Sequence, residues 1–166
     1  MRTDTLEPQD IPALDDDVLA ELLTRARAAA AHAYVPYSHF PVGAAALSSH
    51  GSIYAGCNIE NASYGLTICA ERAAVSSAIS AGHRQIVAVA MSAPKVPLTT
   101  PCGACRQVLN EFRPDTSDMV IVLDDHDSGH SVWLDGLLPQ AFGPRNLHAA
   151  VAREMSSLQQ QDDHVG

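Results

Sequence analysis

The chain has 166 residues, a hydrophobic fraction of 46% and a single tryptophan, a composition typical of one ordinary globular domain. Its 10 Lys and Arg against 19 Asp and Glu give a formal net charge of −9. Such an acidic chain repels phosphate backbones and has no run of basic residues, so we expect no nucleic-acid partner.

The first half predicts a helix followed by a hairpin. Residues 1–15 are rich in acids and prolines, and we expect them to be flexible. Apolar residues then recur at helical spacing after Asp15, Asp16 and Asp17, which are suited to the N-terminal turn, so a helix is predicted over residues 16–33. The hairpin is predicted from apolar segments at 42–47 and 53–57, which are separated by a Gly-containing turn at 49–51.

The second half alternates helices with short apolar runs. Helices are expected over 70–81, 103–112 and 146–155, and strands over 86–91, 119–123 and near 132–133. Gly82 is placed to terminate the first of these helices. Strands alternating with helices predict an α/β fold, with a mixed sheet covered on both faces, in one domain over residues 16–155. The polar tail over 156–166 is expected to be flexible.

The compartment is predicted from the chain's start and its cysteines. Met1-Arg2-Thr3-Asp4 leads into acids rather than an apolar run, and no stretch reaches 18 apolar residues, so we expect neither secretion nor a membrane span. A cytoplasmic location is the resulting expectation. In a reducing compartment the four cysteines favour metal binding or catalysis over disulfides.

Two short motifs carry the chemistry, and each lies at a predicted helix start. They are Cys69-Ala70-Glu71-Arg72 and Pro101-Cys102-Gly103-Ala104-Cys105. Redox pairs and structural zinc sites also contain Cys-x-x-Cys, but the additional Cys-x-Glu gives the pattern of zinc deaminases. Three protein ligands leave the fourth tetrahedral position of zinc open to water, whose pKa zinc lowers to roughly 7. Glu71 is then close enough to take the water proton and pass it to a pyrimidine.

Three thiolates on a dication leave a net negative charge, which weakens the metal as a Lewis acid. The positive ends of the two helices stabilise thiolates and offset part of this charge. Arg72 is the first candidate to donate hydrogen bonds to the sulfur atoms, and Arg106 is a weaker one.

Further segments extend the pattern, and at these residues the chain resembles the small, homotetrameric class of cytidine deaminases. The matching segments are Ala33 to Ala44, Gly56 to Tyr64, Cys69 to Arg72, Pro101 to Phe112 and Leu137 to Pro144. The resemblance covers roughly residues 16 to 150. It implies a three-layer α/β/α domain with a mixed five-stranded sheet, one zinc ion per chain and assembly into a homotetramer. The implied activity is hydrolytic deamination of free cytidine and 2′-deoxycytidine to the uridine forms and ammonia, within pyrimidine salvage.

The resemblance also implies roles for individual residues. Around the metal it implies that Cys69, Cys102 and Cys105 are the zinc ligands. It implies that Glu71 is the proton shuttle and that Arg72 neutralises the thiolates. Around the substrate it implies ribose contacts from Asn58 and Glu60, base contacts from Phe40 and the Ala70 backbone, and residues reaching a neighbouring subunit's site at Ala62, Tyr64 and Phe142. Without the resemblance, the polar pair reads as ordinary strand-end residues and the two phenylalanines as core aromatics.

Three other functions compete with this interpretation. A nucleobase or aminoacyl-nucleoside antibiotic deaminase shares the fold, but the Asn58-x-Glu60 pair favours a nucleoside. A non-catalytic zinc module is disfavoured by Glu71 and by the open fourth position, because structural sites normally supply four ligands. A polynucleotide editor is disfavoured by the net charge of −9.

Overall fold

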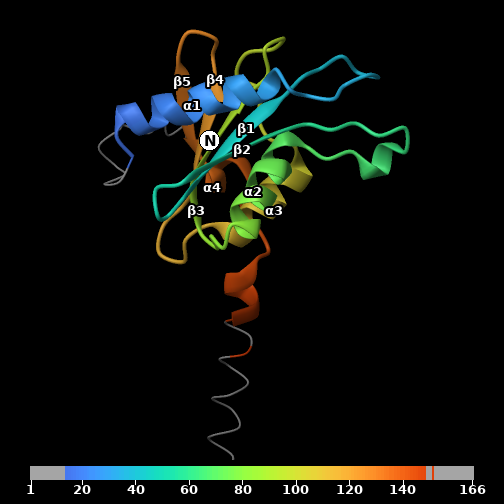
Figure 1. Cartoon of the computed structure of the whole chain (residues 1–166). Helices are drawn as coiled ribbons and strands as arrows, with labels where there is room; N and C mark the ends of the chain where they lie inside the picture. The colour runs from blue at the N-terminus through green and yellow to red at the C-terminus, as the bar shows by residue number, and fades with distance from the viewer. Residues whose placement is uncertain (1–13, 149–150, 152–166) are drawn as a thin grey trace, which may run out of the picture.

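The computed structural model describes residues 14–148 and residue 151. Five strands form one sheet in the order β2-β1-β3-β4-β5 (Figure 1). Their bounds are β1 Gly43–Ser48, β2 Ile53–Cys57, β3 Ile86–Ser92, β4 Val120–Asp124 and β5 Gly129–Trp133. The pair β3 and β4 is parallel and the other pairs are antiparallel, so the sheet is mixed, as predicted.

Helices cover both faces of this sheet (Figure 1). The helices are α1 Asp16–Ala30, α2 Ala70–Ser80, α3 Gly103–Phe112 and the one-turn α4 Leu134–Leu137. Because successive strand residues point to opposite faces, Ala44 and Ala46 of β1 join the core under α2, whereas Ala45 and Leu47 join the core under α1. The two cores confirm the predicted three-layer α/β/α arrangement.

Two glycines allow the helices to touch the hairpin backbone. A Cβ atom on Gly43 would lie 2.0 Å from the carbonyl oxygen of Ala26 in α1. A Cβ atom on Gly56 would lie 2.5 Å from the backbone nitrogen of Ala74 in α2. Helices on opposite faces therefore approach this hairpin more closely than any side chain would permit, and α2 is fixed tightly relative to the sheet.

The helix ends follow the expected capping chemistry, with one correction. The Asp15 carboxylate accepts the Val18 N–H at 2.8 Å and opens α1, and Gly82 closes α2 with a φ of 95°. The first helix ends at Ala30 rather than at residue 33. The N–H groups of His32 and Ala33 bond to carbonyls three residues back, so the chain tightens there and leaves the α-helical path.

Short elements and chain ends account for the other differences from the sequence predictions. The 3-10 helix η2 (Tyr64–Leu66) and α4 were not predicted, because one turn contains too few residues to show a period. Residues 144–148 are helical, so the last helix begins before the predicted residue 146; most of its predicted extent lies outside the described residues. The predicted flexible ends also lie outside them, apart from residues 14 and 15. Within the described ranges, no helix combines the length and hydrophobicity of a bilayer span.

A partly buried ion pair joins the first helix to the ends of the two parallel strands. Arg27 of α1 contacts both carboxylate oxygens of Asp124, at 3.0 and 2.6 Å, and the hydroxyl of Ser92 donates to the same carboxylate at 2.6 Å. Burial acts to raise the pKa of Asp124, but the hydrogen bonds from Arg27 and Ser92 outweigh it and hold the pKa below its ordinary value.

We expect Asp124→Asn to lower the free energy of unfolding at pH 7 by about 1–3 kcal/mol, because it leaves Arg27 without its anionic partner. The folded-state pKa lies below the unfolded one, so this stabilisation is complete above about pH 4 and is lost as the pH falls through the folded pKa. Urea unfolding at several pH values should show the difference between wild type and variant narrowing below about pH 4.

A suitable control is Glu21→Gln, which removes an exposed ion pair with Arg25 on the same helix. That change should cost less than about 0.5 kcal/mol. Equal stability losses for the two variants at pH 7 would contradict the importance given to Asp124.

Candidate active site

Three cysteine sulfur atoms meet where α2 and α3 begin. Cys69 is the N-cap residue of α2, Cys102 is the N-cap residue of α3, and Cys105 lies in the first turn of α3. The sulfur atoms all lie within 4.8 Å of one another, and those of Cys69 and Cys102 are 4.0 Å apart. The structure therefore brings together the three predicted zinc ligands from segments that are distant in the sequence.

The sulfur cluster fits a tetrahedral zinc ion. Zinc–sulfur bonds of about 2.3 Å at tetrahedral angles place neighbouring sulfur atoms roughly 3.8 Å apart. The observed separation of 4.0 Å between Cys69 and Cys102 is close to this value. Three soft sulfur donors are also the ligand set that zinc favours over magnesium or calcium. Only small adjustments would let these residues hold the ion.

Arg72 lies beside the sulfur atoms, as the sequence predicted. Its Nη2 atom donates to the carbonyl of Thr67 at 2.8 Å and lies 3.9 Å from the sulfur of Cys69. Its Nε atom is buried and has no hydrogen-bond partner among the described residues. A partly buried guanidinium with an unused buried donor needs nearby negative charge, and the thiolates would supply it.

The contact between Cys69 and Cys105 shifts the pKa values of the two thiols in opposite directions. A hydrogen bond from Cys105, assisted by Arg72, lowers the pKa of Cys69 to about 5. The same contact, together with burial, raises the pKa of Cys105. The cluster thus holds a thiolate at neutral pH, which is the form that binds a metal.

Glu71 is buried next to this cluster, with only 3% of its surface exposed. Burial raises its pKa above the ordinary value for glutamate, and the negative charge of Cys69 adds to the effect. A carboxyl group whose pKa moves toward neutrality is well suited both to accept and to donate a proton. A glutamate that served only to stabilise the N-terminal end of α2 through the helix dipole could do so from the exposed surface.

Glu60 lines a separate open hollow of about 400 Å³. The hollow is lined by Tyr37, Ser38, Glu60, Tyr64 and Thr67. One Glu60 oxygen accepts the backbone N–H groups of Tyr37 at 2.9 Å and Ser38 at 3.2 Å. Hydrogen bonding by Ser38 and Tyr37 lowers the pKa of Glu60, so its carboxylate stays charged. The hollow is connected to the sulfur cluster through Thr67, whose carbonyl accepts from Arg72.

Asn58 and Phe40 are joined through the backbone. The Asn58 amide donates to the carbonyl of Phe40 and accepts the N–H of Val42, both at 2.9 Å. Phe40 itself is partly buried against the core under α2. Asn58 therefore holds the segment before β1 in place and keeps one N–H free for a further hydrogen bond.

The residues predicted to reach a neighbouring subunit point away from this chain's own core. Ala62 is exposed, Tyr64 is 76% exposed and Phe142 is 64% exposed. The loop that carries Tyr64 extends away from the sheet in Figure 1. Tyr64 lines the hollow beside Glu60, whereas Ala62 and Phe142 are not among its lining residues.

Several residues that support the site are not marked by any sequence motif. Tyr37 and Ser38 hold Glu60, and Thr67 holds Arg72, all partly through backbone groups that no sequence motif reports. Arg106, the weaker candidate to donate to the sulfur atoms, has other hydrogen-bond partners. Its guanidinium donates to the carbonyls of Pro101 and Leu137 at 2.7 Å, and to the Thr100 hydroxyl.

Comparison with known proteins identifies the family. Residues 17–123 match the model for the cytidine and deoxycytidylate deaminase zinc-binding region. The chain belongs to this family. A cytidine deaminase of Sporosarcina psychrophila is 43% identical over 130 residues, which are 78% of this chain and 95% of that protein. Another, from Halalkalibacterium halodurans, is 47% identical over 117 residues, 70% of this chain and 87% of that protein.

Solved structures agree with this family assignment. The crystal structure of cytidine deaminase from Burkholderia pseudomallei has a TM-score of 0.68 and 42% identity, covering 74% of this chain and 98% of that one. Cytidine deaminase from Mycobacterium tuberculosis has a TM-score of 0.65 and 46% identity, covering 75% and 96%. The predicted deaminase fold is thus confirmed. The family's zinc-binding region and the sulfur cluster confirm the predicted cofactor, one zinc ion per chain.

In this deaminase family member, we expect Arg72→Gln to weaken zinc binding by roughly 10- to 100-fold, because the thiolates lose their adjacent cation while the three ligands stay in place. Competition with a chromophoric chelator measures the zinc dissociation constant directly. Arg72→Lys, which keeps the charge, should lie between Gln and wild type. An unchanged zinc dissociation constant in Arg72→Gln would show that the arginine does not support the metal.

Proposed function

We propose that this chain hydrolyses free cytidine and 2′-deoxycytidine to the uridine forms and ammonia, as a cytoplasmic enzyme of pyrimidine salvage. The observation that carries the proposal is the buried carboxyl group of Glu71 beside a three-sulfur metal centre. An open fourth metal position next to a buried acid suits hydrolysis, whereas a structural site supplies four ligands. The names of the relatives and of the solved structures support the same activity.

Glu71 carries the proton through the reaction. When bound to Cys69, Cys102 and Cys105, zinc supplies a Lewis acid that makes water reactive at neutral pH. The Glu71 carboxylate accepts a proton from the attacking water and delivers it to the ring nitrogen of the base. Glu71 then takes the remaining proton from the hydroxyl group on C4 and gives it to the amine, so the C4–N bond breaks, ammonia leaves and the water oxygen stays on C4 as the carbonyl oxygen. Burial keeps this carboxyl group away from bulk water during both transfers.

The ribose and the base are held by residues outside the metal centre. The oxygen of Glu60 that is not bonded to Tyr37 and Ser38 can accept a ribose hydroxyl, and Asn58 has one N–H free to donate. Phe40 stacks on the base. The Ala70 N–H donates to the base carbonyl, because the first N–H groups of a helix have no partner within it.

Charge selects a neutral nucleoside over phosphorylated forms. The lowered pKa of Glu60 keeps a carboxylate at the sugar-binding hollow, and the chain's net charge of −9 adds a wider negative field. Both repel the phosphate of a nucleotide or polynucleotide. Deoxycytidylate, a substrate class named within the family, is therefore disfavoured here.

Neighbouring chains complete each pocket in a homotetramer. Small-molecule sites bury most of their ligand, whereas the hollow beside Glu60 is open in one chain. Large apolar side chains are exposed on the segments that carry or pair with its lining residues, namely Tyr34, Ile59, Tyr64, Leu66 and Ile68. Exposed apolar side chains gathered around a site are typical of an interface. Ala62, Tyr64 and Phe142 are the residues proposed to reach a neighbour's site.

A substrate panel tests the activity. The purified protein should release ammonia from cytidine and deoxycytidine, and much more slowly from cytosine and deoxycytidylate. Glu71→Gln should bind zinc normally yet lose at least roughly 10²- to 10⁴-fold in kcat, because an amide cannot accept the proton. Retention of a tenth of wild-type turnover with zinc bound would contradict the role of Glu71. No ammonia from either nucleoside would overturn the proposed function.

Shared sites are tested by mixing two defective chains. Phe142→Ala should raise the KM for cytidine, because its neighbour's pocket loses an aromatic wall. Exchange with Glu71→Gln chains should restore activity, because some pockets then combine an intact Glu71 with an intact Phe142. Light scattering should report a tetramer for the wild type. An active wild-type monomer, or no restoration after verified subunit exchange, would refute shared sites.

A further inference from the structure

The middle of α3 holds the segment that carries Phe142. The side-chain amides of Gln107 and Asn110 both donate to the carbonyl oxygen of Phe142, at 2.9 and 3.2 Å. These residues are three apart and therefore share one face of the helix. Arg106, beside them, donates to the carbonyl of Leu137 at the start of the same segment. Three side-chain contacts from α3 thus hold residues 137–142 by their backbone carbonyls at both ends of the segment.

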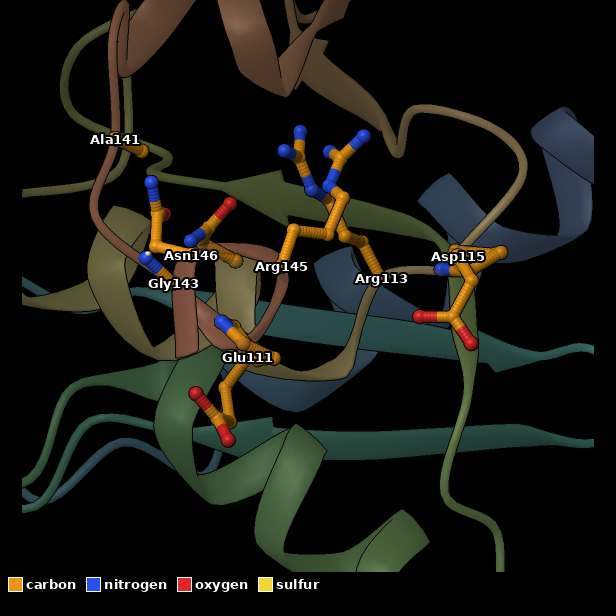
Figure 2. A pocket seen from close by; sticks show the side chains of 10 residues that line it. Glu111, Arg113, Asp115, Ala141, Gly143, Arg145 and Asn146 are labelled. Carbon is orange, nitrogen blue, oxygen red and sulfur yellow. Dashed lines mark hydrogen bonds between the residues drawn. The ribbon is translucent and has the colours of Figure 1, made fainter. Parts of the chain in front are cut away.

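The chain around Phe142 is shaped for this contact. Asn110 is only 4% exposed, and a Cβ atom on Gly143 would lie 2.4 Å from its amide nitrogen. The N–H of Gly143 donates to the Asn146 side chain at 2.8 Å, and Figure 2 shows these two residues together at the edge of a hollow of about 230 Å³. Glycine at position 143 therefore lets the backbone reach Asn110, while Asn146 fixes the turn that follows.

These contacts do not serve to pack the Phe142 ring in its own chain. The ring is 64% exposed, although its carbonyl carries two hydrogen bonds from α3. A carbonyl oxygen has two lone pairs, so both are used to fix one backbone position. Fixing the backbone under an exposed aromatic ring sets the direction in which the ring leaves the surface.

We propose that Gln107 and Asn110 are positioning residues that aim Phe142 at the substrate pocket of a neighbouring chain. The proposal rests on the proposed function, in which Phe142 completes that pocket. The helix that holds Phe142 also begins with Cys102 and Cys105. One rigid ten-residue helix thus fixes both a chain's own metal centre and the ring that it presents to its neighbour.

The test compares Gln107→Met, Asn110→Leu, their double variant and Phe142→Ala. Each polar change keeps the approximate size of the side chain and removes the donor. Because two amides hold one carbonyl, each single variant should raise the KM for cytidine only about two- to threefold. The double variant should raise KM at least about tenfold, toward the value of Phe142→Ala, with kcat within twofold of wild type and full zinc content.

Subunit mixing separates positioning from a general structural defect. In mixed oligomers with excess Glu71→Gln chains, most pockets with an intact Glu71 receive a correctly held Phe142 from the neighbour, so the observed KM should move toward the wild-type value. A defect confined to the variant's own pocket would not be corrected in this way. Glu111→Gln, an exposed change on the same helix, is the matched control and should leave KM unchanged.

Gly143→Ala tests the same contact from the other side, because its added methyl group displaces the segment from Asn110. Gly143→Ala should show the same KM increase as the double variant. It therefore provides the test if the double variant fails to fold. A wild-type KM in the double variant or in Gly143→Ala, with Phe142→Ala impaired, would overturn this inference and leave the proposed function intact. A wild-type KM in Phe142→Ala would instead refute the shared pocket, and this inference with it.

Discussion

The sulfur atoms of Cys69 and Cys102 are held 4.0 Å apart although 33 residues separate them, and this convergence constrains the rest of the fold. It requires α2 and α3 to begin at the same place. Backbone contact at Gly56 fixes α2 against the sheet, because no side chain intervenes. The parallel crossover from β3 to β4 carries α3 on the same face. Gathering three thiolates is costly without a cation, so a metal and the positive helix ends complete the arrangement.

Two arginines near this centre act through different physics. Arg72 lies 3.9 Å from a ligand sulfur and affects the charge that the metal experiences. Arg106 follows Cys105 directly, yet donates to backbone carbonyls and a hydroxyl, so it organises the chain instead. Sequence position does not distinguish the two roles, because both residues follow metal-ligand motifs. The direction of the side chain decides whether a cation tunes the metal or secures the loop that carries Cys102.

The sequence predicted what depends on residue type and spacing, and it missed what depends on backbone contacts. The motifs at Cys69 and Cys102 predicted the sulfur cluster. Short apolar runs predicted the five strands, and helical periodicity predicted the three longer helices among the described residues. The short elements η2 and α4 had no period to detect. The partners of Glu60 are backbone N–H groups, which every residue possesses, so no pattern could single them out. Likewise, nothing in the sequence shows that Asn110 holds a carbonyl 32 residues away.

The proposed chemistry and substrate binding therefore rest on parts that differ in their contact with the core. Glu71 and the cysteines lie on two helices packed against the sheet, where a displacement would disturb the core. Glu60 and Tyr64 lie on the segment between β2 and α2, in which Ile59 forms isolated bridges with Tyr34 and Ile68. The exposed aromatic ring of Phe142 needs separate contacts to fix its position, because no core surrounds it. The helix α3 meets that need with two amides on one carbonyl, and in the proposed homotetramer the same element would serve a chain's own metal and its neighbour's pocket.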